Sequence, residues 1–166
     1  MRDRSFFLIF LIAVAAQILA NNFLNLSQYV LISCLPGLIL CVPARIKTPF
    51  LLIITFITGF FVDLLAGGMI GLTLVALLPV AFVRNWLFGL ILGNDTLSRM
   101  ESLSVSKQGS NRISAVLILM ILLYFVIYIW TDSAGTRPFW FNAVKLVSST
   151  LVSYVVSLLV VKIAAP

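Results

Sequence analysis

Residues 50–83 read FLLIITFITGFFVDLLAGGMIGLTLVALLPVAFV, an apolar stretch of 34 residues. As a single α-helix it would be about 51 Å long, far beyond the roughly 30 Å of hydrocarbon in a bilayer. The chain must therefore reverse direction within it. Glycine adopts the positive φ angles that a tight turn between helices requires, so Ala66-Gly67-Gly68 is the expected turn. The stretch predicts a hairpin of two membrane-crossing helices, 49–65 and 69–83.

The rest of the chain is equally apolar. Of its 166 residues, 62% are hydrophobic and 10% are charged, whereas a soluble domain has about 45–50% apolar and about 25% charged residues. Four further apolar runs are long enough to cross a bilayer: 5–21, 23–42, 113–130 and 144–162. We therefore expect an all-α integral membrane protein. It would be a bundle of six transmembrane helices in a single domain over residues 1–166, with a polar loop at 93–112.

Lys and Arg residues are unevenly divided between the two sides of this bundle. Nine of the eleven fall on the side of both termini and the polar loop: Arg2, Arg4, Arg45, Lys47, Arg84, Arg99, Lys107, Arg112 and Lys162. Only Arg137 and Lys145 fall on the other side. Because such cations concentrate in cytoplasmic loops, both termini are predicted to face the cytoplasm. Arg45, Lys47 and Arg84 then form a candidate basic face for a partner or for anionic lipid, and the positive charge needs no nucleic acid to explain it.

Residues 84–92 follow the second helix of the hairpin and are largely apolar. Arg84 would be costly inside lipid. It lies 13 residues after Gly71, or about 20 Å along a helix, toward the membrane face opposite the turn. We therefore expect residues 84–92 to form an interfacial extension of the helix.

Side chains for catalysis or metal binding are scarce. The chain has no His, two Cys and five acidic residues, too few for a His-dependent triad, a zinc site or a carboxylate-rich metal site. Cys34 and Cys41 are seven residues apart in an apolar run, which suits neither a CxxC redox pair nor a disulfide framework. Four serines line part of the last predicted helix: Ser148, Ser149, Ser153 and Ser157. Without a base to activate them they indicate helix packing, so we expect no enzyme activity and no cofactor.

Asp63 is the one acidic residue that clearly lies inside a predicted span, and such residues are functional candidates by default. It lies four residues after Gly59, so both share one helix face, and small residues there allow another helix to approach closely. The candidate helix-packing or partner face comprises Gly59, Asp63, Gly67, Gly68 and Gly71. Asp63 has three interpretations: an acceptor for backbone N–H groups of the turn, a contact to a partner or to another helix of this chain, or a carrier of protons or substrate.

Two prolines, Pro36 and Pro79, interrupt predicted spans. Proline removes a helix hydrogen bond and its ring clashes with the preceding turn. Broken helices can mark transporter binding sites, but simple kinks are common, and we interpret both prolines as kinks.

The span layout and one motif resemble the MreD family of bacterial rod shape-determining proteins. The motif is a Pro-x-Arg turn followed by a glycine-rich hairpin: Pro43-Ala44-Arg45, then Gly59-x-x-x-Asp63-Leu64-Leu65-x-Gly67-Gly68-x-x-Gly71-Leu72. Residue-level similarity is confined to about 43–83, while length and span number match over nearly the whole chain. Substrate-binding subunits of energy-coupling-factor transporters are similar in size and span number, and MreD is thought to share their fold.

The resemblance implies a non-enzymatic subunit of the elongation complex in the bacterial cytoplasmic membrane. Such a subunit binds MreC and helps to link MreB filaments to peptidoglycan synthesis by RodA and its penicillin-binding transpeptidase, and so helps to determine cell shape. The five residues of the packing face match the family's pattern.

The alternative is a small-molecule binding or transport subunit of the energy-coupling-factor type. That function requires a water-accessible pocket near the outer face, lined by groups such as Asp63, Asn142, Trp140 and Tyr154. Few other polar residues lie inside the predicted spans, which favours the assembly subunit over the transport subunit.

Overall fold

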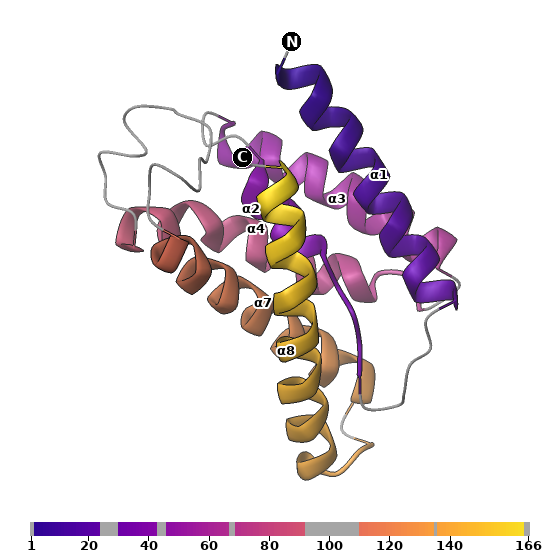
Figure 1. The fold of residues 1–166 in the computed structure, drawn as a ribbon. Helices are drawn as coiled ribbons and strands as arrows, with labels where there is room; N and C mark the ends of the chain where they lie inside the picture. The colour runs from indigo at the N-terminus through magenta and orange to yellow at the C-terminus, as the bar shows by residue number, and fades with distance from the viewer. Residues whose placement is uncertain are drawn as a thin grey trace.

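The computed structural model describes residues 2–23, 30–42, 46–66, 69–91, 110–134 and 136–164. Within these ranges the chain forms six α-helices: α1 (Arg2–Phe23), α2 (Leu35–Cys41), α3 (Thr48–Leu65), α4 (Leu72–Ile91), α7 (Ser110–Ser133) and α8 (Phe139–Ala164). In Figure 1, α3 and α4 lie side by side, α7 and α8 form a second hairpin, and α1 runs along the outside. The predicted loop at 93–112 falls largely outside the described residues.

Four helices in the described part of the chain are long and apolar enough to cross a membrane: Thr48–Leu65, Leu72–Leu90, Arg112–Ser133 and Phe139–Lys162. The apolar part of α1, Leu8–Phe23, is shorter. The chain is therefore a helical, membrane-embedded protein. Four of the six predicted spans correspond to these long helices.

The α3–α4 hairpin forms where the apolar stretch predicts it. Gly71 has a φ of +97°, a left-handed conformation that glycine adopts without steric cost, and α4 begins at the next residue. Gly67 and Gly68 lie outside the described residues. α4 continues without interruption through Ile91, with Pro79 inside it, so residues 84–91 belong to the same helix and Pro79 does not end it.

The predicted helix over 23–42 is wrong. The described part of this region is non-helical from Val30 to Cys34 and continues as α2, a helix of only 7 residues. Pro36 gives the physical reason, because its ring would clash with the carbonyl one turn earlier and it has no N–H to donate. Proline fits the first turn of a helix, and Pro36 occupies that position in α2.

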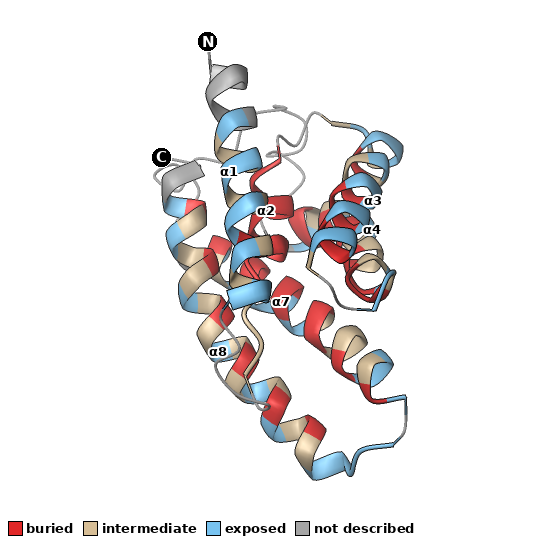
Figure 2. Cartoon of the chain, turned by 90° about the vertical axis from the view of Figure 1, so that its right-hand side faces the viewer, coloured by how far each residue is buried: buried red, intermediate tan, exposed pale blue. Residues whose placement is uncertain are grey.

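α2 lies at the centre of the molecule. All seven of its residues are buried, and it contacts α1, α4, α7 and α8. Figure 2 shows α2 in the colour of buried residues, with the longer helices around it exposing their outer faces. Non-helical backbone is tolerated at membrane depth only where protein satisfies its hydrogen bonds, so the segment before α2 requires specific partners.

Candidate functional site

Serines on α8 form hydrogen bonds with backbone groups on one side of the non-helical segment before α2. Ser149, Ser153 and Ser157 are four residues apart, so they share one helix face, and all three are fully buried. The Leu31 N–H donates to Ser149 Oγ and the Ser33 N–H donates to Ser153 Oγ, both at 2.9 Å. In return, Ser153 Oγ donates to the Leu31 carbonyl at 3.3 Å, and Ser157 Oγ donates to the Ser33 carbonyl at 3.4 Å. We call these three side chains the serine ladder.

Gln17 on α1 forms hydrogen bonds with backbone groups on the other side of this segment. Its Oε1 accepts a hydrogen bond from the Cys34 N–H at 2.8 Å, and its Nε2 donates to the Ile32 carbonyl at 2.9 Å. Nε2 also donates to Asn21 Oδ1 at 2.8 Å within α1. Residues 31 and 33 therefore bond to α8, while residues 32 and 34 bond to α1. This alternation is that of a β-strand, with side chains in place of neighbouring strands.

The close approach of α2 to α8 depends on Gly37. A Cβ added there would lie 2.9 Å from Ser157 Cβ and 3.4 Å from Ser157 Cα. Contacts this short force neighbouring atoms to move. The glycine therefore allows α2 to pack beside the serine ladder.

We expect Gly37→Ala to lower the free energy of unfolding by about 2 kcal/mol, because the added methyl overpacks this contact. Combining it with Ser157→Gly should cost less than the sum of the two single changes, since the second change removes the clashing Cβ. A double-mutant cycle of unfolding in detergent measures this coupling. Strict additivity would show that the contact between the two positions is not the cause.

Arg84 stabilises the other end of α2. It is fully buried, and its Nη2 donates to the Val42 carbonyl and, at 3.4 Å, to the Leu40 carbonyl. Its guanidinium carbon lies 4.7 Å from the centre of the Phe88 ring. A cation at a helix C-terminus is favourable because the last carbonyls carry partial negative charge.

The prediction that Arg84 belongs to a basic face is therefore wrong. The carbonyls of α2 and the Phe88 ring hold its side chain inside the bundle. Lys47 is exposed, next to the start of α3. Arg45 lies outside the described residues.

Asp63 closes the α3–α4 hairpin. It is 5% exposed, and its carboxylate accepts hydrogen bonds from the N–H groups of Gly71 at 2.9 Å, Thr73 at 3.2 Å and Leu74 at 3.3 Å. These donors belong to the turn and to the first turn of α4, where a carboxylate is favourable. The first interpretation of Asp63, an acceptor for backbone N–H groups, is confirmed.

Gly59 faces α4, the helix that Asp63 caps. A Cβ added to it would lie 3.1 Å from Leu74 Cα, so the small residue lets α3 approach the α4 backbone. Gly59 and Asp63 are both buried, while Gly71 forms the turn. At Gly59 and Asp63 the predicted packing face is thus directed at α4 of the same chain.

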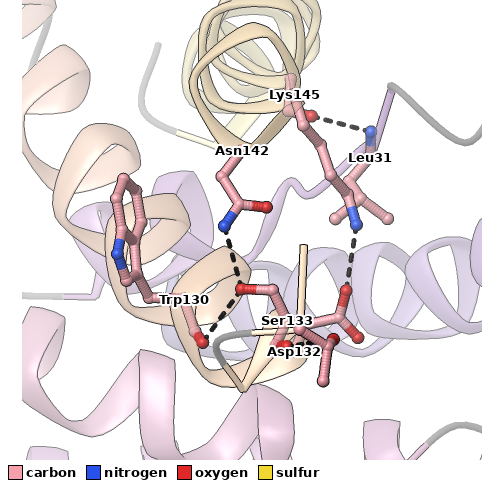
Figure 3. Close-up of polar contacts among 8 residues, drawn as sticks. Leu31, Trp130, Asp132, Ser133, Asn142 and Lys145 are labelled. Carbon is pink, nitrogen blue, oxygen red and sulfur yellow. Dashed lines mark hydrogen bonds and ion pairs between the residues drawn. The ribbon is translucent and has the colours of Figure 1, made fainter. Parts of the chain in front are cut away.

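An ion pair that the sequence reasoning missed joins α7 to α8. Lys145 Nζ lies 3.0 Å from Asp132 Oδ2, with the two side chains 7% and 29% exposed. Figure 3 shows this pair beside a second link, in which Asn142 Nδ2 donates to Ser133 Oγ at 3.0 Å. The only sequence signal was an acid and a base on either side of a short turn. The pair neutralises one of the two cations predicted for this side of the bundle.

The residues named for a ligand pocket lie in different environments. Asp63 is engaged between α3 and α4, and Asn142 is buried against Ser133. Trp140 is 80% exposed. Tyr154 is half-buried and packs against the core.

No protein-family model, curated protein or solved structure matches the chain. In the part of the chain that the structure describes, no group of three or more His, Cys, Asp or Glu residues could hold a metal ion. Most of the polar side chains described above bond to the chain's own backbone, and the others link α7 to α8. Among the described residues, the large exposed side chains of the helices are mostly apolar, and α3 presents the most aromatic face.

Proposed function

We propose that this chain is a non-enzymatic assembly subunit that binds other membrane proteins through its outer helix faces. The observation that carries this proposal is that the buried polar side chains of the protein point inward. Gln17, Asp63, Arg84 and the serine ladder all bond to backbone groups of the same chain. Helix–helix association within the bilayer is then the function that the remaining surface suits.

The resemblance to the MreD family suggests the location and the partners of such a subunit. The subunit would lie in the bacterial cytoplasmic membrane, bind MreC, and act directly or indirectly with RodA, its penicillin-binding transpeptidase and MreB. The motif carrying the resemblance includes Gly59, Asp63 and Gly71, which together make the α3–α4 hairpin. In this proposal the motif builds the hairpin, and the hairpin's outer face binds the partner.

The outer face of α3 is the proposed partner surface. Its exposed apolar residues are Phe50, Ile53, Phe56, Ile57, Phe60, Phe61, Leu64 and Leu65. The rings of Phe56 and Phe60 are stacked, with their centres 6.4 Å apart and planes 5° from parallel. Aromatic side chains provide large contact area for little lost conformational freedom, which suits a surface that packs against a single transmembrane helix.

We expect the double change Phe56→Ala and Phe60→Ala to lower recovery of a co-expressed single-span partner about tenfold, which corresponds to about 1.4 kcal/mol. Thermal stability should be unchanged, because both rings lie outside the core. The matched control is Phe82→Ala, which removes an exposed ring from α4 and should leave recovery intact. Equal recovery from the double variant and the parent protein would remove α3 as the partner surface.

A small-molecule binding or transport subunit is the second candidate. Two buried oxygens, Ser33 Oγ and Asn142 Oδ1, have no hydrogen-bond partner, and unpaired buried polar atoms can accept a polar ligand or water. A small molecule bound one-to-one in the purified protein would favour this function over assembly.

A further inference from the structure

Arg84 has donors that the protein leaves unused. Nη2 bonds to the end of α2, but Nε and Nη1 are buried and have no hydrogen-bond partner. The one ion pair among the described residues joins Lys145 and Asp132, so no carboxylate in that part of the chain neutralises Arg84. A fully buried guanidinium without a counter-ion is costly. The partial charges of the α2 carbonyls offset only part of that cost.

The position of Arg84 along the bundle suggests which anion could pair with it. The next residue, Asn85, donates from Nδ2 to Thr48 Oγ1 at 2.8 Å, and Thr48 is the first residue of α3. The guanidinium lies over Phe88, one turn further toward the end of α4. Arg84 therefore lies in the part of α4 that packs beside the start of α3, seven residues before the last residue of α4.

The same end of the bundle is positively charged. α3 and α7 begin there, and α4 and α8 end there. Lys47, Arg112 and Lys162 are exposed at these helix ends. Clusters of this kind attract anionic headgroups, because each cation near the surface contributes about 1 kcal/mol.

We propose that Arg84 is the centre of a binding site for a phosphate-type anion, located beside the C-terminal end of α2 and the Phe88 ring of α4. The anion's oxygens accept hydrogen bonds from Nε and Nη1, while Nη2 stays on the α2 carbonyls. Arginine suits this task because it stays charged and presents several fixed donors to phosphate. Enclosed with the guanidinium in a medium of low dielectric constant, such a bond is stronger than in water. The site does not depend on the assembly function proposed above.

Thermal unfolding of the full chain in micelles of a phosphorus-free maltoside detergent tests the proposal with two probes, phosphatidylglycerol and inorganic phosphate. We expect phosphatidylglycerol to raise the Tm of the parent protein by about 4 °C, and Arg84→Lys to reduce that rise to about 1 °C. Lysine can still donate to the α2 carbonyls, but its single nitrogen cannot also place donors where Nε and Nη1 lie. Lys162→Gln, which removes an exposed cation from the same end, should keep most of the rise.

Each outcome has one meaning. A rise with phosphatidylglycerol alone identifies a lipid headgroup as the anion, and an equal rise with inorganic phosphate identifies a free anion. Equal rises in the parent protein and Arg84→Lys, or no rise with either probe, would overturn the site. If Arg84→Lys does not fold, phosphorus analysis of the purified parent protein decides: about one phosphate bound per chain supports the site, and none overturns it.

Discussion

Replacing Ser153 with alanine is expected to lower the free energy of unfolding by about 3 kcal/mol, although it removes a single oxygen atom. That hydroxyl accepts the Ser33 N–H and donates to the Leu31 carbonyl. Without it, two buried backbone groups lose their partner, and each unpaired group costs about 1–3 kcal/mol. The better helix propensity of alanine offsets about 0.5 kcal/mol of this loss of stability. Equilibrium unfolding in detergent, followed by circular dichroism, measures the change.

The matched control for Ser153→Ala is Ser114→Ala, which changes a half-buried serine of α7 outside the serine ladder. It should change stability by less than about 0.5 kcal/mol. Similar values for the two variants would show that the ladder does not hold the non-helical segment. The account of how the chain accommodates a broken helix would then fail.

Removing the carboxylate of Asp63 is the second change with a large expected effect. Asp63→Ala should destabilise the protein by about 3 kcal/mol, because it leaves the N–H groups of Gly71, Thr73 and Leu74 without their acceptor at the start of a helix. Asp63→Asn keeps one acceptor oxygen and should cost about 1 kcal/mol, the contribution of the lost charge. The same unfolding measurement applies to both variants.

The comparison of alanine with asparagine also separates the roles of Asp63. A cap tolerates asparagine better than alanine, in stability and in partner recovery alike. A proton carrier would lose activity with either change. If Asp63→Asn were as stable as the parent protein but lost partner binding completely, the capping role would not account for the residue.

The sequence was sufficient to predict the features that follow from length and hydropathy. The apolar stretch at 50–83 is too long for one crossing, so the α3–α4 hairpin could be placed before the structure was known, although α4 begins at Leu72 and not at residue 69 as predicted. Asp63 could be recognised because a carboxylate inside an apolar helix needs partners, and the nearest N–H groups are those of the turn.

The broken second helix could not be predicted from hydropathy. Its residues are as apolar as those of a span, and Pro36 is compatible with a kink as well as with a helix start. The informative signal was on another helix, where Ser149, Ser153 and Ser157 recur every four residues. That spacing also fits ordinary helix packing, and only the fold shows that non-helical backbone lies against it.

Charge counting likewise predicted that Arg84 lies on the side of the termini but not that its side chain is buried. A cation near a helix end normally reaches toward water. Here the carbonyls that end α2, distant in sequence, attract it inward. The pair of Lys145 and Asp132 was missed for a similar reason, because Lys145 was counted only as a cation on the outer side of the bundle, whereas it lies inside α8 and is nearly buried.

A pull-down of the tagged protein from its native membrane in mild detergent, with mass spectrometry of the retained proteins and small molecules, tests the central claim most directly. The assembly function predicts recovery of a single-span coiled-coil protein together with cell-wall synthases, and loss of that protein from the Phe56→Ala, Phe60→Ala variant. Recovery of paired ATPases with a coupling subunit, or of a small ligand bound one-to-one, would contradict it and assign the chain to transport.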